Sequence, residues 1–116
     1  MDISIGGTAP VFEQLRTQVM EQVRDGRLSP GAKLPTVRGL ADELGIAPNT
    51  VAKAYKLLEA DEVIETRGRA GTFIAAHGDP TTRQAQLAAS AYAARIRELG
   101  IPAEDALALA AAALSV

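Results

Sequence analysis

The sequence contains no cysteine and few aromatic residues, and both absences limit what the chain can be. Without cysteine it can form neither disulfides nor thiolate metal sites. Aromatic residues make up only 3% of the 116 residues, although apolar residues make up 47%. Much of the apolar content is alanine, concentrated after residue 84. Because alanine buries little area per residue, we expect this part of the chain to need a partner surface.

Long apolar runs and an excess of positive charge are also missing. No run approaches the roughly 20 apolar residues of a membrane span. The N-terminus, MDISIGGTAP, lacks the basic and apolar regions of a secretory signal. We therefore expect a soluble, cytoplasmic protein without membrane contact. The net charge of −2 argues against a bulk electrostatic attraction to nucleic acid, but binding depends on where the cations lie rather than on their sum.

Residues for catalysis are scarce as well. The chain has a single histidine, His77, and no phosphate-binding P-loop or plausible catalytic triad. The glycines at 68 and 71 are too close together, and wrongly placed, for a nucleotide-binding fingerprint. The sequence therefore predicts no enzyme, no catalytic residue, no metal and no cofactor.

Two amphipathic segments separated by a tight turn occupy the middle of the chain. Thr36 can cap the first segment, Gly45 ends it, and Pro48 lies in the first turn of the second. The apolar residues on each side recur at helical spacing: Val37, Leu40, Ala41 and Leu44, then Val51, Ala54, Tyr55 and Leu58. This order predicts a helix-turn-helix.

The period changes after Asp61. Residues 63–67 and 72–75 read as two strands, and the glycine-containing loop 68–71 joins them in a hairpin. Residues 32–34 could add an edge strand. Because a two-stranded hairpin is marginal alone, we expect it to pack on the helices. The predicted fold is mainly α with a small β-hairpin wing, that is, a winged helix-turn-helix domain followed by two C-terminal helices.

Composition divides the chain into four parts. Residues 1–9 are expected to be flexible, 10–76 to form the winged domain, 77–80 to be a linker, and 81–116 to form a two-helix dimerisation region. Within the winged domain a first helix should run from Pro10 to about Asp25. In the tail, residues 81–99 carry a short heptad-like seam and a last helix ends near Leu114. The predicted dimerisation residues are Ala85, Ala89, Tyr92, Ile96, Leu99, Leu107, Ala110 and Leu114.

A series of spaced motifs resembles the GntR-type winged-helix regulators. In chain order the motifs are Gly26-Arg27-Leu28, Pro30-Gly31, Leu34-Pro35, Arg38, Leu40-Ala41, Asn49-Thr50-Val51, Leu58-Glu59-Ala60, and Gly68 with Gly71-Thr72-Phe73. Several blocks in the right order are more specific than one short motif. The segment Ala47-Pro48-Asn49-Thr50-Val51 and the short tail are similar to the YtrA-type group. The tail leaves no room for the metabolite-binding domain of larger members.

The resemblance implies a bacterial transcriptional regulator that binds a (pseudo)palindromic double-stranded DNA operator as a homodimer. Repression is the favoured activity, with activation left open. The resemblance also implies DNA contacts from Arg38 and from the wing tip, Arg67, Gly68 and Arg69. Many members have arginines at the positions of Pro48 and Ala52, so two specificity determinants of the family are absent here.

The second helix of the motif offers its own candidates for reading bases. Its first turns carry Asn49 and Thr50, and asparagine can pair with two adenine positions at once. Lys53 lies one turn further on, and Lys56 one turn later should reach only phosphate. Arg38 could instead form a salt bridge with Glu43.

Two alternatives remain open from the sequence. The acidic balance and the apolar tail would also suit a winged-helix protein-interaction module without specific DNA binding. A small-molecule effector could bind between the domain and the tail helices, although its identity is unknown and a large pocket is not expected.

Overall fold

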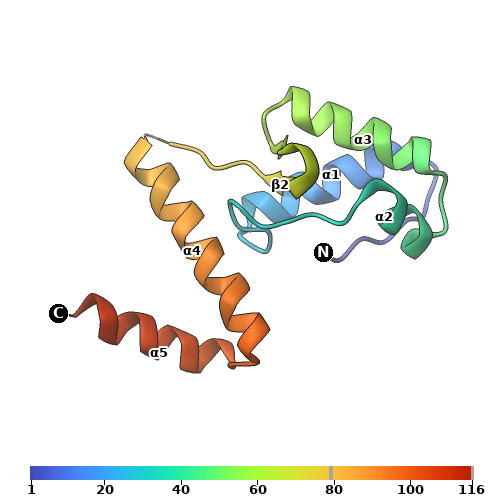
Figure 1. Cartoon of the computed structure of the whole chain (residues 1–116). Coiled ribbons are helices and arrows are strands. Elements are labelled where there is room, and N and C mark those ends of the chain that lie inside the picture. The colour runs from blue at the N-terminus through green and yellow to red at the C-terminus, as the bar shows by residue number, and fades with distance from the viewer. Residues whose placement is uncertain (79, 116) are drawn as a thin grey trace. The chain divides into compact units, whose positions relative to one another are not determined.

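Five α-helices and one antiparallel hairpin follow one another in the computed structural model, which describes residues 1–78 and 80–115 (Figure 1). The chain divides into two units, one ending at His77 and the other beginning at Gly78. The first unit holds α1 (Val11–Arg24), α2 (Val37–Leu44), α3 (Pro48–Ala60), β1 (Ile64–Thr66), the 3₁₀ turn η1 (Gly68–Ala70) and β2 (Thr72–Ile74). The second holds α4 (Pro80–Leu99) and α5 (Ala103–Leu114). The predicted mainly helical fold with a hairpin wing is confirmed.

The turn between α2 and α3 forms as its residues predict. The Thr36 hydroxyl caps α2 by accepting from the Gly39 N–H at 3.0 Å. Gly45 ends the helix in the left-handed region with φ 67°, a conformation that costs glycine nothing. The Ile46 N–H then bonds back to the Ala41 carbonyl at 3.0 Å. Pro48 opens α3, where its missing N–H would have had no partner.

The core of the first unit lies between α1, the helix-turn-helix and the hairpin. α1 contributes Leu15 and Val19, and both are fully buried. The apolar stripes of the other two helices meet them, and the hairpin closes the core with Ile64 and Ile74. The hairpin therefore packs on the helices, as expected. Burying such side chains contributes on the order of 1.5–3 kcal/mol each.

The wing is a small sheet of three segments. β1 and β2 pair antiparallel with Ile64 opposite Ile74 and Thr66 opposite Thr72. The connector before α2 lies along the other edge of β2, where Lys33 forms a bridge with Phe73 and the Leu34 N–H donates to the Thr72 carbonyl at 2.8 Å. The connector thus contributes an isolated bridge at Lys33 in place of the predicted edge strand over residues 32–34. The strands are shorter than the predicted 63–67 and 72–75, because Arg67 already turns into the loop.

The segment before α1 lies along that helix through a row of glutamine side chains. Gln18 accepts from the Ser4 N–H at 2.9 Å and donates to the Ser4 carbonyl at 2.7 Å. Gln22 donates to the Asp2 carbonyl at 2.6 Å, and Gln14 accepts from the Gly6 N–H at 2.9 Å. These contacts were not foreseen for the part of the chain that the sequence analysis treats as a flexible lead-in.

The second unit is a pair of helices joined by a short turn. Gly100 adopts φ 71° and its neighbour Ile101 bonds back to the Ile96 carbonyl at 3.1 Å, which ends α4 where predicted. Only Ile96 and Ala106 are buried among the described apolar residues of this unit. Two residues within the predicted boundaries, 79 in the linker and 116 in the tail, lie outside the described part of the chain.

Candidate nucleic-acid interface

Helix α3 presents an exposed polar row on the side opposite the core. Asn49, Lys53 and Lys56 are exposed, while Thr50 is half-buried beside them. Their spacing of four and three residues places the three exposed side chains on one face of the helix. The opposite face is buried through Val51 and its helical neighbours. The structure therefore brings the four predicted residues of this helix to one accessible surface.

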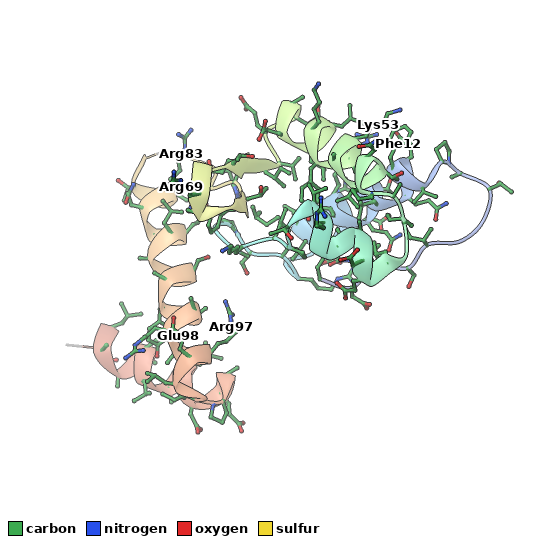
Figure 2. The ribbon with its side chains drawn as sticks, turned by 45° about the vertical axis from the view of Figure 1, so that its right-hand side comes forward. Phe12, Lys53, Arg69, Arg83, Arg97 and Glu98 are labelled. Atoms are coloured by element: carbon green, nitrogen blue, oxygen red, sulfur yellow. The ribbon has the colours of Figure 1, made fainter. Side chains whose placement is uncertain are left out.

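Lys53 is held by a contact that the sequence analysis did not identify. Its Nζ lies 3.9 Å from the centroid of the Phe12 ring, which belongs to α1 (Figure 2). An ammonium over an aromatic face is attracted by the negative face of the ring. The ring does not neutralise the charge, so Lys53 remains a cation at the surface. Phe12 itself is partly buried and packs against the core of the first unit.

Arg38 lies in the first turn of α2, two residues after the Thr36 cap, and its side chain is exposed. Within residues 1–78 and 80–115, no ion pair joins Arg38 to Glu43. The alternative structural role as a salt-bridge partner is therefore not seen. The guanidinium is available for a planar, two-pronged contact with a phosphate or a guanine.

The wing carries two arginines in different environments. The Arg67 Nε donates to Glu65 Oε1 at 2.9 Å, and its guanidinium carbon lies 4.2 Å from the centroid of the Phe73 ring. Arg69 is exposed, and none of the ion pairs found in the described residues includes it. Gly68 precedes it with φ 53°, which lets the backbone turn sharply at the tip. Arg67 is therefore already partnered, and Arg69 is the accessible wing arginine.

The acidic side chains collect at the far end of α3. Asp61 pairs with Arg16 of α1 at 3.5 Å. Glu59 accepts a hydrogen bond from the Thr66 hydroxyl at 2.6 Å. These carboxylates are occupied within the domain, while the cations lie nearer the start of the helix. Along α3 the two signs of charge are thus separated, although the chain as a whole is slightly acidic.

Tyr55 fixes α3 to the entry of α2. Its hydroxyl donates to the Pro35 carbonyl at 2.8 Å, and the side chain is 6% exposed. Burial raises the pKa of the Tyr55 hydroxyl above its ordinary value. The neutral, hydrogen-bonded tyrosine holds the exposed row on α3 in a fixed relation to the start of α2.

The second unit has an apolar groove between α4 and α5, with a volume of about 1060 Å³. It contains seven of the eight residues predicted for dimerisation, and Leu99 lies outside it. The Tyr92 hydroxyl crosses to the Ala106 carbonyl at 2.7 Å and ties the two helices together. Leu107 and Leu114 in the groove are 72% and 85% exposed, and exposed apolar patches are typical of interaction surfaces.

Residues 1–78 and 80–115 contain neither a cluster suited to a metal ion nor a helix suited to crossing a membrane. No group of three or more histidine, aspartate or glutamate side chains is placed to hold a metal ion. No helix within these ranges has the length and apolar character that crossing a membrane requires.

A helix-turn-helix with a hairpin wing and an exposed, cation-bearing second helix defines a winged-helix nucleic-acid-binding unit. Residues 11–74 match the family described as bacterial regulatory proteins, gntR family. The chain belongs to this family, as the motifs predicted, and the family consists of transcriptional regulators rather than enzymes.

Two bacterial transcriptional regulators are similar to the chain. It is 50% identical over 107 residues to the HTH-type transcriptional regulator Rv1152 of Mycobacterium tuberculosis, covering 92% of this chain and 86% of Rv1152. It is 47% identical over 75 residues to the HTH-type transcriptional repressor YtrA of Bacillus subtilis, covering 64% of this chain and 57% of YtrA.

Solved structures share the fold. A YtrA from Sulfolobus acidocaldarius, a GntR-family transcription factor, matches with a TM-score of 0.61 and 25% identity, covering 99% of this chain and 97% of that chain. The DNA-binding domain of AraR, solved in complex with operator ORX1, matches with a TM-score of 0.57 and 22% identity over 65% of this chain and 96% of that chain. At that identity the AraR match shows the fold alone.

Proposed function

We propose that this transcriptional regulator binds a specific DNA operator as a homodimer and represses the genes beside it. The observation that carries the proposal is the exposed row on α3, with Asn49 in its first turn and Lys53 one turn on. Helices of this kind enter the major groove with their N-terminal residues against the base edges. Such a contact would place the protein's action in the cytoplasm, where bacterial operators lie.

Each predicted contact has a chemical role in this proposal. Asn49 reads adenine through its amide, and Thr50 touches a thymine methyl or a phosphate. Arg38 and Lys53 bind guanine or phosphate from the two helices. Lys56 contacts phosphate only. At the wing, Arg69 enters the minor groove beside Gly68, and Arg67 joins it by exchanging its carboxylate partner for phosphate.

Selection from random duplexes with the intact chain tests the function directly. We expect one enriched inverted repeat, bound tightly and weakened steeply by salt. Asn49→Ala should lower affinity for this sequence by about tenfold or more while leaving binding to a shuffled duplex almost unchanged. Selection of no sequence would instead support the alternative of a protein-interaction module.

Pairing of two chains is proposed through the groove between α4 and α5. A two-helix unit that buries only Ile96 and Ala106 among its described apolar residues gains little stability alone. A second copy of the unit would cover Leu107 and Leu114. The two recognition helices would then read half-sites about 34 Å apart, or a multiple of that distance.

The oligomeric state can be tested with two matched leucines of α5. Leu107 lies in the groove, whereas Leu109 is 55% exposed and does not line it. We expect light scattering to give the mass of a dimer for the wild type and for Leu109→Asp, and the mass of a monomer for Leu107→Asp. A dimer that survives Leu107→Asp would exclude this groove as the interface.

Repression rests on the resemblance to YtrA of Bacillus subtilis, which is named a repressor. A reporter gene placed behind the selected operator gives the sign of regulation. Expression should rise when the regulator is removed and should also rise with Asn49→Ala.

A further inference from the structure

Lys33 occupies a position between the two parts of the interface described above. It belongs to the connector that lies along β2, and it is paired with Phe73 across the bridge. Three residues later Thr36 caps α2, and Arg38 follows in the first turn. The backbone of Lys33 therefore lies between the wing and Arg38, which is in the first turn of α2. The sequence predicted an edge strand that includes Lys33 but no DNA contact from this residue.

The outer face of the wing sheet fixes where the Lys33 side chain goes. Strand alternation places Glu65, Phe73 and Lys33 in one row across the three segments, because each is the register partner of the next. The opposite face carries Ile64 and Ile74 into the core. The row of Glu65, Phe73 and Lys33 therefore lies on the side of the sheet away from the core.

Gly71 shows how closely the lysine lies on the wing. A Cβ at this glycine would come within 2.9 Å of Lys33 Cε and 3.6 Å of its Nζ. Real Cβ atoms do not approach other atoms to 2.9 Å, so the bare backbone of Gly71 makes space for the lysine stem. Its φ of 116° also requires glycine at this position. The ammonium of Lys33 is thus placed beside Gly71, in the loop that also carries Arg69.

The charges on this face are unequal. Arg67 is paired with Glu65 and stacked on Phe73, so its charge is largely compensated within the protein. Lys33 is exposed and takes part in none of the ion pairs formed by residues 1–78 and 80–115. A phosphate approaching between the wing and α2 would meet Lys33 as the uncompensated cation of this row.

We propose that Lys33 binds a phosphate of the DNA backbone, linking the wing contact to the Arg38 contact in one continuous surface. This inference rests on the proposed function, since it needs a bound duplex. A lysine is a compact point charge that suits phosphate and carries no base preference. Lys33 would therefore contribute affinity and register rather than specificity.

The salt dependence of binding separates this role from a structural one. Affinity of the full chain is measured at several KCl concentrations, on a duplex selected with the wild type and on a shuffled duplex. With Lys33→Met we expect binding about tenfold weaker near 0.1 M salt, and a slope of log K against log[KCl] reduced by about 0.9 per chain bound. Both duplexes should lose similar factors, and Lys33→Arg should restore the slope.

The matched control removes one positive charge from the second unit. Arg95→Met should leave the slope unchanged, because Arg95 is exposed on α4 and paired with Glu98 at 3.1 Å. A thermal melt of each variant checks that it is folded. If the wild type binds its selected duplex and Lys33→Met keeps the full slope, the inference about Lys33 is wrong and the proposed function stands. A wild type that binds neither duplex overturns both.

Discussion

The ammonium of Lys53 lies over the ring of Phe12, with the Nζ 3.9 Å from the ring centroid. The two residues belong to α3 and α1, so the contact joins the proposed recognition helix to the helix behind it. A free lysine loses rotamer freedom when it binds, at a cost of about 0.5–1.5 kcal/mol. A lysine already held over a ring has lost part of that freedom before DNA arrives. We therefore expect Phe12 to act as a positioning residue for Lys53.

Replacing Phe12 should weaken DNA binding only when Lys53 is present. Phe12→Leu keeps an apolar side chain in the partly buried site but removes the aromatic face. We expect affinity for the selected duplex to fall about two- to fivefold, the range of an exposed cation–π contact of about 0.5–1 kcal/mol. In the Lys53→Met background the same change should have no further effect. Fluorescence anisotropy on the four proteins gives the double-mutant cycle.

The cycle distinguishes positioning from a general loss of structure. If Phe12→Leu lowered affinity equally in both backgrounds, its effect would come from the packing of α1 and not from Lys53. Tighter binding after Phe12→Leu would mean that the ring competes with DNA for the ammonium.

Glu65 should limit how strongly the wing binds DNA. It holds Arg67 in an exposed ion pair and places a negative charge on the face that a DNA phosphate would approach in the proposed complex. Glu65→Gln should therefore raise affinity about threefold and steepen the salt dependence, with little change in melting temperature because exposed ion pairs contribute little. Glu21→Gln, which removes an exposed acid from α1, is the matched control in the same anisotropy titration. If both variants raised DNA affinity equally, the increase would come from the change in net charge and not from the position of Glu65.

Tyr55 makes stability depend on pH in the alkaline range. At pH 8, Tyr55→Phe should lower the free energy of unfolding by about 1 kcal/mol, because the carbonyl of the half-buried Pro35 loses its donor. Burial raises the pKa of Tyr55, so the unfolded chain ionises this hydroxyl first and the wild type loses stability as pH rises above about 10. At pH 11 the wild type should have lost about 1.4 kcal/mol relative to Tyr55→Phe, which closes the gap between the two proteins and slightly reverses it.

Urea unfolding at the two pH values measures this gap. Other groups also titrate between pH 8 and 11, but they are shared by both proteins and cancel in the difference. A gap that stayed constant would show that Tyr55 ionises equally easily in the folded and unfolded chains.

Local residues made the fold predictable. Thr36, Gly45 and Pro48 fix the ends of α2 and α3 through capping and backbone geometry that depend on near neighbours alone. The apolar stripes then leave one face of α3 free, which is why the exposed positions of Asn49 and Lys53 follow from spacing.

The contacts of the charged residues could not be predicted from near neighbours in the sequence. Arg67 is predicted as a DNA contact of the wing tip, and its contact with the Phe73 ring depends on the register of the hairpin. The contact of Lys53 with Phe12 joins residues 41 positions apart and depends on how α1 packs. One signal was present in the sequence, because Gln14, Gln18 and Gln22 recur every four residues and so lie on one face of a helix.

These glutamines give the last prediction. A glutamine amide offers one acceptor and one donor group, as a peptide does, so the row on α1 pairs with the backbone of residues 2–9 as a neighbouring strand would. Gln18→Ala removes both bonds to Ser4 and should detach the segment locally. We expect the amide of Ser4 to exchange hydrogen at least about tenfold faster, since a lost hydrogen bond of about 0.5–1.5 kcal/mol acts twice. Thr17→Ala, at an exposed neighbour without such bonds, should leave exchange unchanged. Equal protection of Ser4 in Gln18→Ala would show that the packing of Ile3 against the core, rather than the glutamine row, holds the segment.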